Sequence, residues 1–139
     1  MASMPPEVIE LFQDPSVPKM VATVDGKGEL NVTPKTSMIA VNPGTLAFAD
    51  LYGMTTRTFR NLQETKKVAI VAMKVPLAPP FTTYQVKGTF LKYEKSGPLF
   101  DKFTKALKDA MGVDITGVGV VQVDSVYSQA PQDKGKKLA

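Results

Sequence analysis

The residues of this chain best suited to chemistry lie in the segment TTRTFRN, residues 55–61. The pattern predicts that a helix begins here, and the first amides of a helix have no partner while the helix dipole makes that end positive. A phosphate placed there would gain hydrogen-bond donors and a favourable field. Arg57 adds a fork of donors that suits phosphate oxygens, and Thr55, Thr56 and Thr58 add hydroxyl groups. The segment therefore predicts a phosphate-binding helix start; the alternative is a threonine that only caps the helix beside a solvated Arg57.

A second candidate is VTPKT, residues 32–36, within a stretch from Leu30 to Ala40 that otherwise has the composition of a β-strand. Pro34 removes a hydrogen-bond donor from the strand ladder, which suits a place where the backbone faces a ligand instead of another strand. Lys35 places a cation beside it. The alternative is an edge strand that Pro34 and Lys35 protect against aggregation.

The absence of histidine and cysteine excludes several kinds of site. Without them the chain has no Ser-His-Asp triad, no histidine-ligated haem or zinc and no thiolate chemistry, and we expect no metal site. The segment GKGELN at Gly26 lacks the third glycine of a dinucleotide-binding fingerprint and opens no helix. Any redox chemistry would therefore come from a bound cofactor.

Composition bounds the class of protein. With 139 residues, 43% hydrophobic and 22% charged, the chain is predicted to fold as one globular domain, residues 1–139, with a polar tail from about residue 129. We find no signal peptide and no run of membrane-spanning length, so we expect a cytoplasmic protein without membrane contact. The net charge of +4 is modest and indicates a solvated surface rather than a nucleic-acid partner.

The elements that must position the candidate residues are mostly short strands. Strands are predicted within residues 19–24, 30–40, 45–50, 67–75, 82–94 and 117–129, and helices within 5–14, 55–67 and 96–112. The apolar run 67–75 is predicted to be buried on both faces, and Gly88 predicts a bulge. Turns at Asp25–Gly28 and at residues 42–44 connect antiparallel strands. The pattern is typical of a small antiparallel barrel with helices outside.

The succession GELNVTPKTSMIAV, TLAFAD, TTRTFRNLQETKKVAIV and VKGTFLKYE resembles the pyridoxamine 5′-phosphate oxidase-like FMN-binding split barrels, especially their small single-domain members, over about residues 16–128. The resemblance implies a mainly β fold with flanking helices, a six-stranded antiparallel Greek-key split β-barrel. It also implies a homodimer that binds FMN in the cleft between subunits. Carried over to this chain, the family's FMN-binding positions are Thr33, Pro34, Lys35, Thr36, Ala49, Asp50, Thr56, Arg57 and Thr58.

Each of these positions inherits a role from the resemblance. Arg57 and Thr58, with Thr56 beside them, would hold the flavin phosphate. The backbone of residues 33–36 would run along the flavin ring, and Ala49 and Asp50 would lie near the ring or the ribityl chain. Lys35 would place positive charge near the flavin N1–C2 region and favour the anionic reduced form.

The resulting hypothesis is an FMN flavoprotein, an oxidoreductase or an electron carrier with a small-molecule or protein redox partner. We assign no catalytic residue, since Asp50 and Tyr84 are the only candidate proton donors near the ring. No arginine and histidine set for pyridoxamine phosphate is found, which argues against oxidation of that vitamer. Alternatives are a deazaflavin in place of FMN, a structural dimer with an empty cleft, and a nucleic-acid-binding barrel using Tyr84, Phe90 and Tyr93, of which Tyr93 is predicted on the opposite face.

Overall fold

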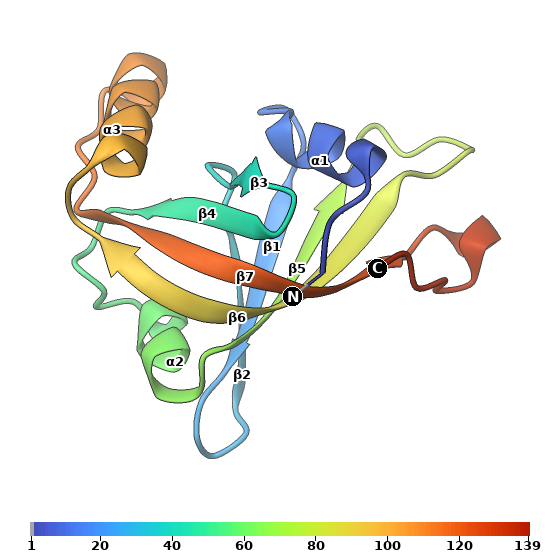
Figure 1. Cartoon of the computed structure of the whole chain (residues 1–139), viewed down its shortest axis with the longest axis horizontal. Helices are drawn as coiled ribbons and strands as arrows, with labels where there is room; N and C mark the ends of the chain where they lie inside the picture. The colour runs from blue at the N-terminus through green and yellow to red at the C-terminus, as the bar shows by residue number, and fades with distance from the viewer. Residues whose placement is uncertain (1) are drawn as a thin grey trace.

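A single antiparallel sheet of seven strands dominates the computed structural model, which describes residues 2–139 (Figure 1). The strand order is β2-β1-β5-β6-β7-β4-β3, and the two outermost strands are not hydrogen-bonded to each other, so the sheet is open. The strands are β1 (Lys19–Val24), β2 (Leu30–Pro34), β3 (Ile39–Asn42), β4 (Thr45–Asp50), β5 (Lys67–Met73), β6 (Thr83–Glu94) and β7 (Gly117–Ser128). The helices are α1 (Pro6–Gln13), α2 (Arg57–Thr65) and α3 (Pro98–Met111), followed by a short 3-10 helix, Pro131–Asp133.

The stretch from Leu30 to Ala40 forms two strands rather than one. β2 ends at Pro34, which has no amide hydrogen to continue the ladder, and β3 begins at Ile39. The amide of Lys35 donates to the carbonyl oxygen of Lys19 at 2.8 Å, and the chain then turns away. β2 pairs with β1 at one edge of the sheet and β3 pairs with β4 at the other. The prediction of six strands is therefore wrong by one, because Pro34 divides this stretch.

The local signals in the sequence place most of the other elements correctly. The helices near residues 5–14, 55–67 and 96–112 are present, and so are the turn between β1 and β2 and the turn between β3 and β4. In the first of these turns the carboxylate of Asp25 accepts from the amides of Lys27 and Glu29, at 2.8 and 2.9 Å. Gly28 adopts a left-handed φ of 87°, which explains the glycine there.

Two groups of buried side chains form the core. The larger group fills the concave side of the sheet under α1 and α2 and includes Phe12, Phe48 and Phe59. The smaller group lies beneath α3 and includes Phe103 and Leu107, the two buried residues of that helix. Figure 1 shows α3 standing apart from α1 and α2, at the end of the sheet where β6 and β7 meet it. Leu99 and Phe100 of α3 also pack, partly buried, against this group, whereas most other residues of the helix are exposed, so much of its surface stays open.

The run 67–75 is buried on one face only, so the prediction of burial on both faces is not met within this chain. Along β5, buried residues alternate with half-exposed Ala69, Val71 and Met73. The strand registers place these β5 residues beside the outward residues of β1. The outward residues of β1 lie in turn beside the outward residues of β2. We call this surface the outer apolar face; it consists of Met20, Ala22, Val24, Leu30, Val32, Pro34, Ala69, Val71 and Met73.

The polar segment after residue 128 is held against the sheet rather than extending as a tail. Its backbone returns along β7, where the amide of Ser128 donates to the carbonyl oxygen of Lys136 and that of Leu138 to Val126, both at 2.8 Å. Leu138 and Ala139 also pack against the larger core group. No helix within residues 2–139 is long and apolar enough to cross a membrane.

Gly88 occupies the predicted bulge, where the register between β6 and β7 shifts. A Cβ atom built there would lie 2.6 Å from the carbonyl oxygen of Gln122 and 2.6 Å from a methyl group of Val121. We expect Gly88→Ala to lower the free energy of unfolding by about 1–3 kcal/mol, because the backbone must shift to relieve this overlap. Urea denaturation measures the change.

Gly26→Ala is the matched control for this prediction. Gly26 lies outside the left-handed region, and its Cβ would meet only the flexible end of the Glu64 side chain. We expect the free energy of unfolding of this surface variant to change by less than about 0.5 kcal/mol. Equal stability of the two variants would contradict the close approach at Gly88.

Candidate functional site

The N-terminus of α2 presents the first group of predicted site residues. Thr56 is the N-cap, and its hydroxyl oxygen accepts from the amide of Phe59 at 3.4 Å. Arg57 and Thr58 are the first two helical residues, and the first turn contains no acidic residue. First-turn amides have no acceptor within the helix itself. This helix start therefore has the positive character that an anion requires.

The side chain of Thr58 joins α2 to the strand β2. Its hydroxyl oxygen lies 2.7 Å from the hydroxyl oxygen of Thr33 and accepts from the side-chain amide of Asn31 at 3.2 Å. Thr58 is buried, whereas Asn31 and Thr33 are partly exposed. The sequence analysis did not identify Asn31. The signal for it was the period of two in a strand, which places residues 31 and 33 on the same face.

Arg57 is exposed and weakly held. Its side chain is 66% exposed, and its only ion pair within residues 2–139 is a 3.5 Å contact with Glu29, whose side chain is 67% exposed. Exposed pairs of this kind contribute about 0–1 kcal/mol, so little opposes exchange of Glu29 for another anion. Asn31, Thr33, Arg57 and Thr58 form what we call the phosphate cluster. Two hydroxyl groups, an amide and a guanidinium at a helix N-terminus are a donor set that fits a phosphate monoester.

Asp50 is fully buried, and its carboxylate is occupied by groups of its own chain. It accepts from the amides of Tyr52 and Met54, at 3.1 and 2.7 Å, and from the hydroxyl of Tyr93 at 2.7 Å. The backbone carbonyl oxygen of Asp50 accepts from the amide of Thr116 at 2.8 Å. Burial, assisted by the Asp50 charge, raises the pKa of Tyr93 to about 12, so this hydroxyl is a stable donor. Asp50 thus organises the loop that leads into α2, and Tyr93 and Thr116 are site residues that the sequence analysis missed.

Lys35 lies beside an aromatic cluster behind α2. Its ammonium nitrogen is 5.7 Å from the centre of the Phe59 ring. Burial lowers the pKa of Lys35, and the charge of Asp50 opposes this effect. A partly desolvated cation exerts a stronger field than a solvated one, which suits the electrostatic role predicted for this residue.

The aromatic residues of β6 are not arranged as predicted. Phe90 and Tyr93 both pack around Phe59, with ring centres 6.4 and 5.5 Å from it. Tyr93 reaches the same side as Phe90 because the register of β6 shifts between Phe90 and Lys92. The prediction that Tyr93 lies on the opposite face is therefore wrong. Since Phe90 is buried, it offers no surface on which a nucleic-acid base could stack.

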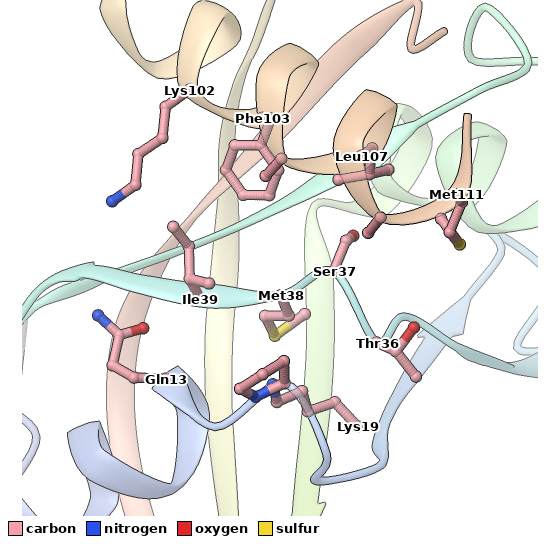
Figure 2. Close-up of a pocket in the computed structure, with 13 residues that line it drawn as sticks. Gln13, Lys19, Thr36, Ser37, Met38, Ile39, Lys102, Phe103, Leu107 and Met111 are labelled. Carbon is pink, nitrogen blue, oxygen red and sulfur yellow. The ribbon is translucent and has the colours of Figure 1, made fainter. Parts of the chain in front are cut away.

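The remaining predicted site residues lie in other surroundings. The amide of Ala49 donates to the hydroxyl of Ser37 at 3.1 Å, which ties β4 to the turn between β2 and β3. Pro34 belongs to the outer apolar face, and Thr36 lines a cavity next to α3. The structure therefore brings Thr33, Arg57 and Thr58 together. Pro34 lies instead on the outer apolar face, and Thr36 lies at the cavity next to α3 (Figure 2).

An open, curved antiparallel sheet with a helix start facing its edge strand defines the split-barrel class. The chain belongs to the pyridoxamine 5′-phosphate oxidase family, whose model matches residues 4–137. No curated protein sequence matches the chain.

Solved structures share this fold at low sequence identity. An FMN-binding protein from Syntrophomonas wolfei superposes with a TM-score of 0.80 at 17% identity, covering 89% of this chain and 84% of the other. HupZ from Group A Streptococcus superposes with a TM-score of 0.77 at 24% identity, covering 98% of this chain and 99% of the other. An F420 reductase superposes with a TM-score of 0.64 at 18% identity, covering 84% of this chain and 93% of the other.

We expect Asp50→Asn to lower the free energy of unfolding by about 1–3 kcal/mol, because the new amide places donors against the donors that now surround the carboxylate. Urea denaturation measures this loss, and hydrogen exchange at the amides of Tyr52 and Met54 should become faster. Asp109→Asn, which breaks only a surface ion pair with Lys105, is the control and should cost less than about 0.5 kcal/mol. Unchanged exchange at both amides would contradict the role assigned to Asp50.

Proposed function

We propose that this protein is an FMN-binding flavoprotein that transfers electrons or hydride through the flavin, as an oxidoreductase or an electron carrier. The observation that carries the proposal is the phosphate cluster, which combines a helix N-terminus, hydroxyl groups and a loosely held guanidinium. Membership of the family supports it, and so does the fold shared with a protein described as FMN-binding. Bound FMN would supply the redox chemistry that the side chains of this chain lack.

The proposal keeps the roles that the resemblance implies for the site residues. Arg57 and Thr58, with Thr56 beside them, would hold the phosphate. The backbone of residues 33–36 would follow the ring, because Thr33 already contacts Thr58 and the strand ends one residue later. Ala49 and Asp50, at the end of β4, would lie near the ribityl chain or the ring. Asp50 would act indirectly, because its carboxylate holds the loop that leads into α2.

The first test is the visible spectrum of the purified protein, with any small molecule released by denaturation identified by mass. We expect absorption of an oxidised flavin and release of FMN, or uptake of added FMN by a colourless preparation. Arg57→Ala should weaken FMN binding about 10- to 100-fold, because a charge-assisted contact to the phosphate is lost. Riboflavin, which lacks the phosphate, should bind equally well to both forms.

Arg60→Ala is the matched control, since Arg60 is an exposed arginine one turn further along α2. The affinity of the Arg60→Ala variant for FMN should differ from that of the wild type by less than about twofold. A protein that takes up neither FMN nor F420 would contradict the proposal, and preferential uptake of F420 would assign the site to a deazaflavin instead.

We also propose that the protein forms a homodimer through the outer apolar face, with the flavin in the cleft between the two copies. Leu30 is 74% exposed and Val32 59% exposed on this face, and the neighbouring positions of β1 and β5 are also apolar. A contiguous exposed apolar patch usually marks an interface. A second copy would bury the outward face of β5 and so explain why both faces of this strand are apolar from Val68 to Met73.

Val32→Asp should raise the dimer dissociation constant at least about 100-fold, because each copy would bury an unpaired carboxylate. Sedimentation velocity or light scattering over a range of protein concentrations measures the mass of the species in solution and so the dissociation constant. Val41→Asp, at an exposed position of β3 outside the outer apolar face, is the control and should stay dimeric. A wild-type protein that is monomeric at high concentration would overturn this part of the proposal.

A further inference from the structure

One carboxylate group lies against the phosphate cluster. The Oε1 atom of Glu29 is 3.5 Å from a terminal guanidinium nitrogen of Arg57. Glu29 directly precedes β2, the strand that carries Asn31 and Thr33. Within residues 2–139, no other carboxylate forms an ion pair or a hydrogen bond with a residue of the cluster. In the described part of the chain, Glu29 therefore supplies the negative charge that Arg57 contacts.

The turn between β1 and β2 fixes the backbone of Glu29. The amide of Glu29 donates to the carboxylate of Asp25 at 2.9 Å, and its carbonyl oxygen accepts from the amide of Asp25 at 3.0 Å. Figure 1 shows this turn at the same end of the sheet as α2. The side chain of Glu29, in contrast, is mostly exposed and keeps its rotational freedom. Its carboxylate is thus kept close to Arg57 without being tightly bound there.

A phosphate held by Arg57 would take the place of this carboxylate. Both anions accept hydrogen bonds from a guanidinium, and they do so through oxygen atoms of similar spacing. Displacing Glu29 from Arg57 costs the free energy of an exposed ion pair, and a carboxylate that stays nearby repels the phosphate. Both effects lower the affinity for a ligand that carries a phosphate, and neither acts on a ligand without one.

The competing explanation is that the contact between Glu29 and Arg57 is a structural tether between β2 and α2. These elements are already joined by stronger contacts. Thr58 of α2 is hydrogen-bonded to β2, and the side-chain amide of Asn61 in α2 donates to the hydroxyl of Thr23 in β1 at 3.1 Å. Thr58, Asn61 and Thr23 are all buried, whereas the contact with Glu29 is exposed. The geometry of the cluster therefore does not depend on Glu29.

We propose that Glu29 is a specificity-determining residue of the phosphate cluster, because its carboxylate competes with the phosphate of the ligand for Arg57. Glu29 thereby sets how strongly the protein prefers a phosphorylated ligand to the same ligand without its phosphate. This inference rests on the proposed function, since it takes the cluster as the site of the FMN phosphate. The tether and the competitor predict opposite signs: loss of a tether weakens phosphate binding, and loss of a competitor strengthens it.

Glu29→Gln keeps the shape of the side chain and removes its charge. We expect FMN to bind this variant about two- to fivefold more tightly than the wild type, the range that an exposed ion pair accounts for. The affinity for riboflavin should stay unchanged, so the ratio of the two affinities rises. Glu64→Gln is the matched control, since it removes the same charge from an exposed position of α2 outside the cluster. Its affinity for FMN should change by less than about 1.5-fold, because solvent and salt screen a charge that makes no contact.

A double-mutant cycle connects the effect to Arg57. In the Arg57→Ala background, Glu29→Gln should change the FMN affinity by less than about 1.5-fold, because no guanidinium remains for which the two anions compete. Calorimetric titration or flavin fluorescence gives the four affinities. An FMN affinity that is unchanged or weaker in Glu29→Gln would overturn the inference about Glu29 and leave the proposed function intact.

Inorganic phosphate tests the same competition without a flavin. The NMR signal of the side-chain Nε of Arg57 should respond to phosphate at a lower concentration in Glu29→Gln than in the wild type, by the same two- to fivefold factor. This response in a protein that does not bind FMN would overturn the proposed function and support the role of Glu29. A protein that binds neither FMN nor inorganic phosphate at Arg57 would overturn both.

Discussion

The connection between β2 and β3 constrains the whole molecule. These strands form opposite edges of a seven-stranded sheet, yet only residues 35–38 separate them. A chain from Pro34 to Ile39 can span at most about 18 Å. The edges of a flat sheet of this size would lie about 29 Å apart. The sheet must therefore curl until its edges approach each other, and the concave side so formed encloses the larger core group.

The same curvature explains why one strand serves two surfaces. In β1 the side chains of Lys19, Val21 and Thr23 are buried on the concave side, while Met20, Ala22 and Val24 point outward. The first set reaches the core and, at Lys19, the cavity beneath α3. The second set is part of the outer apolar face. Alternation along a single strand thus separates the exposed outer apolar face from the buried side chains of the concave side.

The sequence predicted the features that depend on neighbouring residues. The start of α2 at Thr56 and Arg57, the turn at Asp25–Gly28 and the bulge at Gly88 all have local causes, namely a capping hydroxyl, an Asp-Gly turn and a residue without a Cβ. These signals also predicted a mainly antiparallel β fold with flanking helices, although the sheet is open at its edges rather than closed into a barrel.

The features that the sequence did not predict depend on distant residues. The buried environment of Asp50 comes from Tyr93 and Thr116, which lie 43 and 66 positions further along the chain. Tyr93 is on the inner side only because of an irregularity in the pairing with β7. The division at Pro34 was visible as an interruption, but nothing near it indicated that the next strand would pair at the far edge.

The phosphate cluster also determines how recognition would respond to acidity. Its donors are the hydroxyl groups of Thr33 and Thr58, the amide of Asn31 and the guanidinium of Arg57. The three uncharged donors, which are the two hydroxyl groups and the amide, do not ionise between about pH 5 and 8. A phosphate monoester, in contrast, loses its second proton near about pH 6. These three donors are therefore the same in mildly acidic and neutral solution, and a pH dependence of their contacts with the phosphate would come from the ligand.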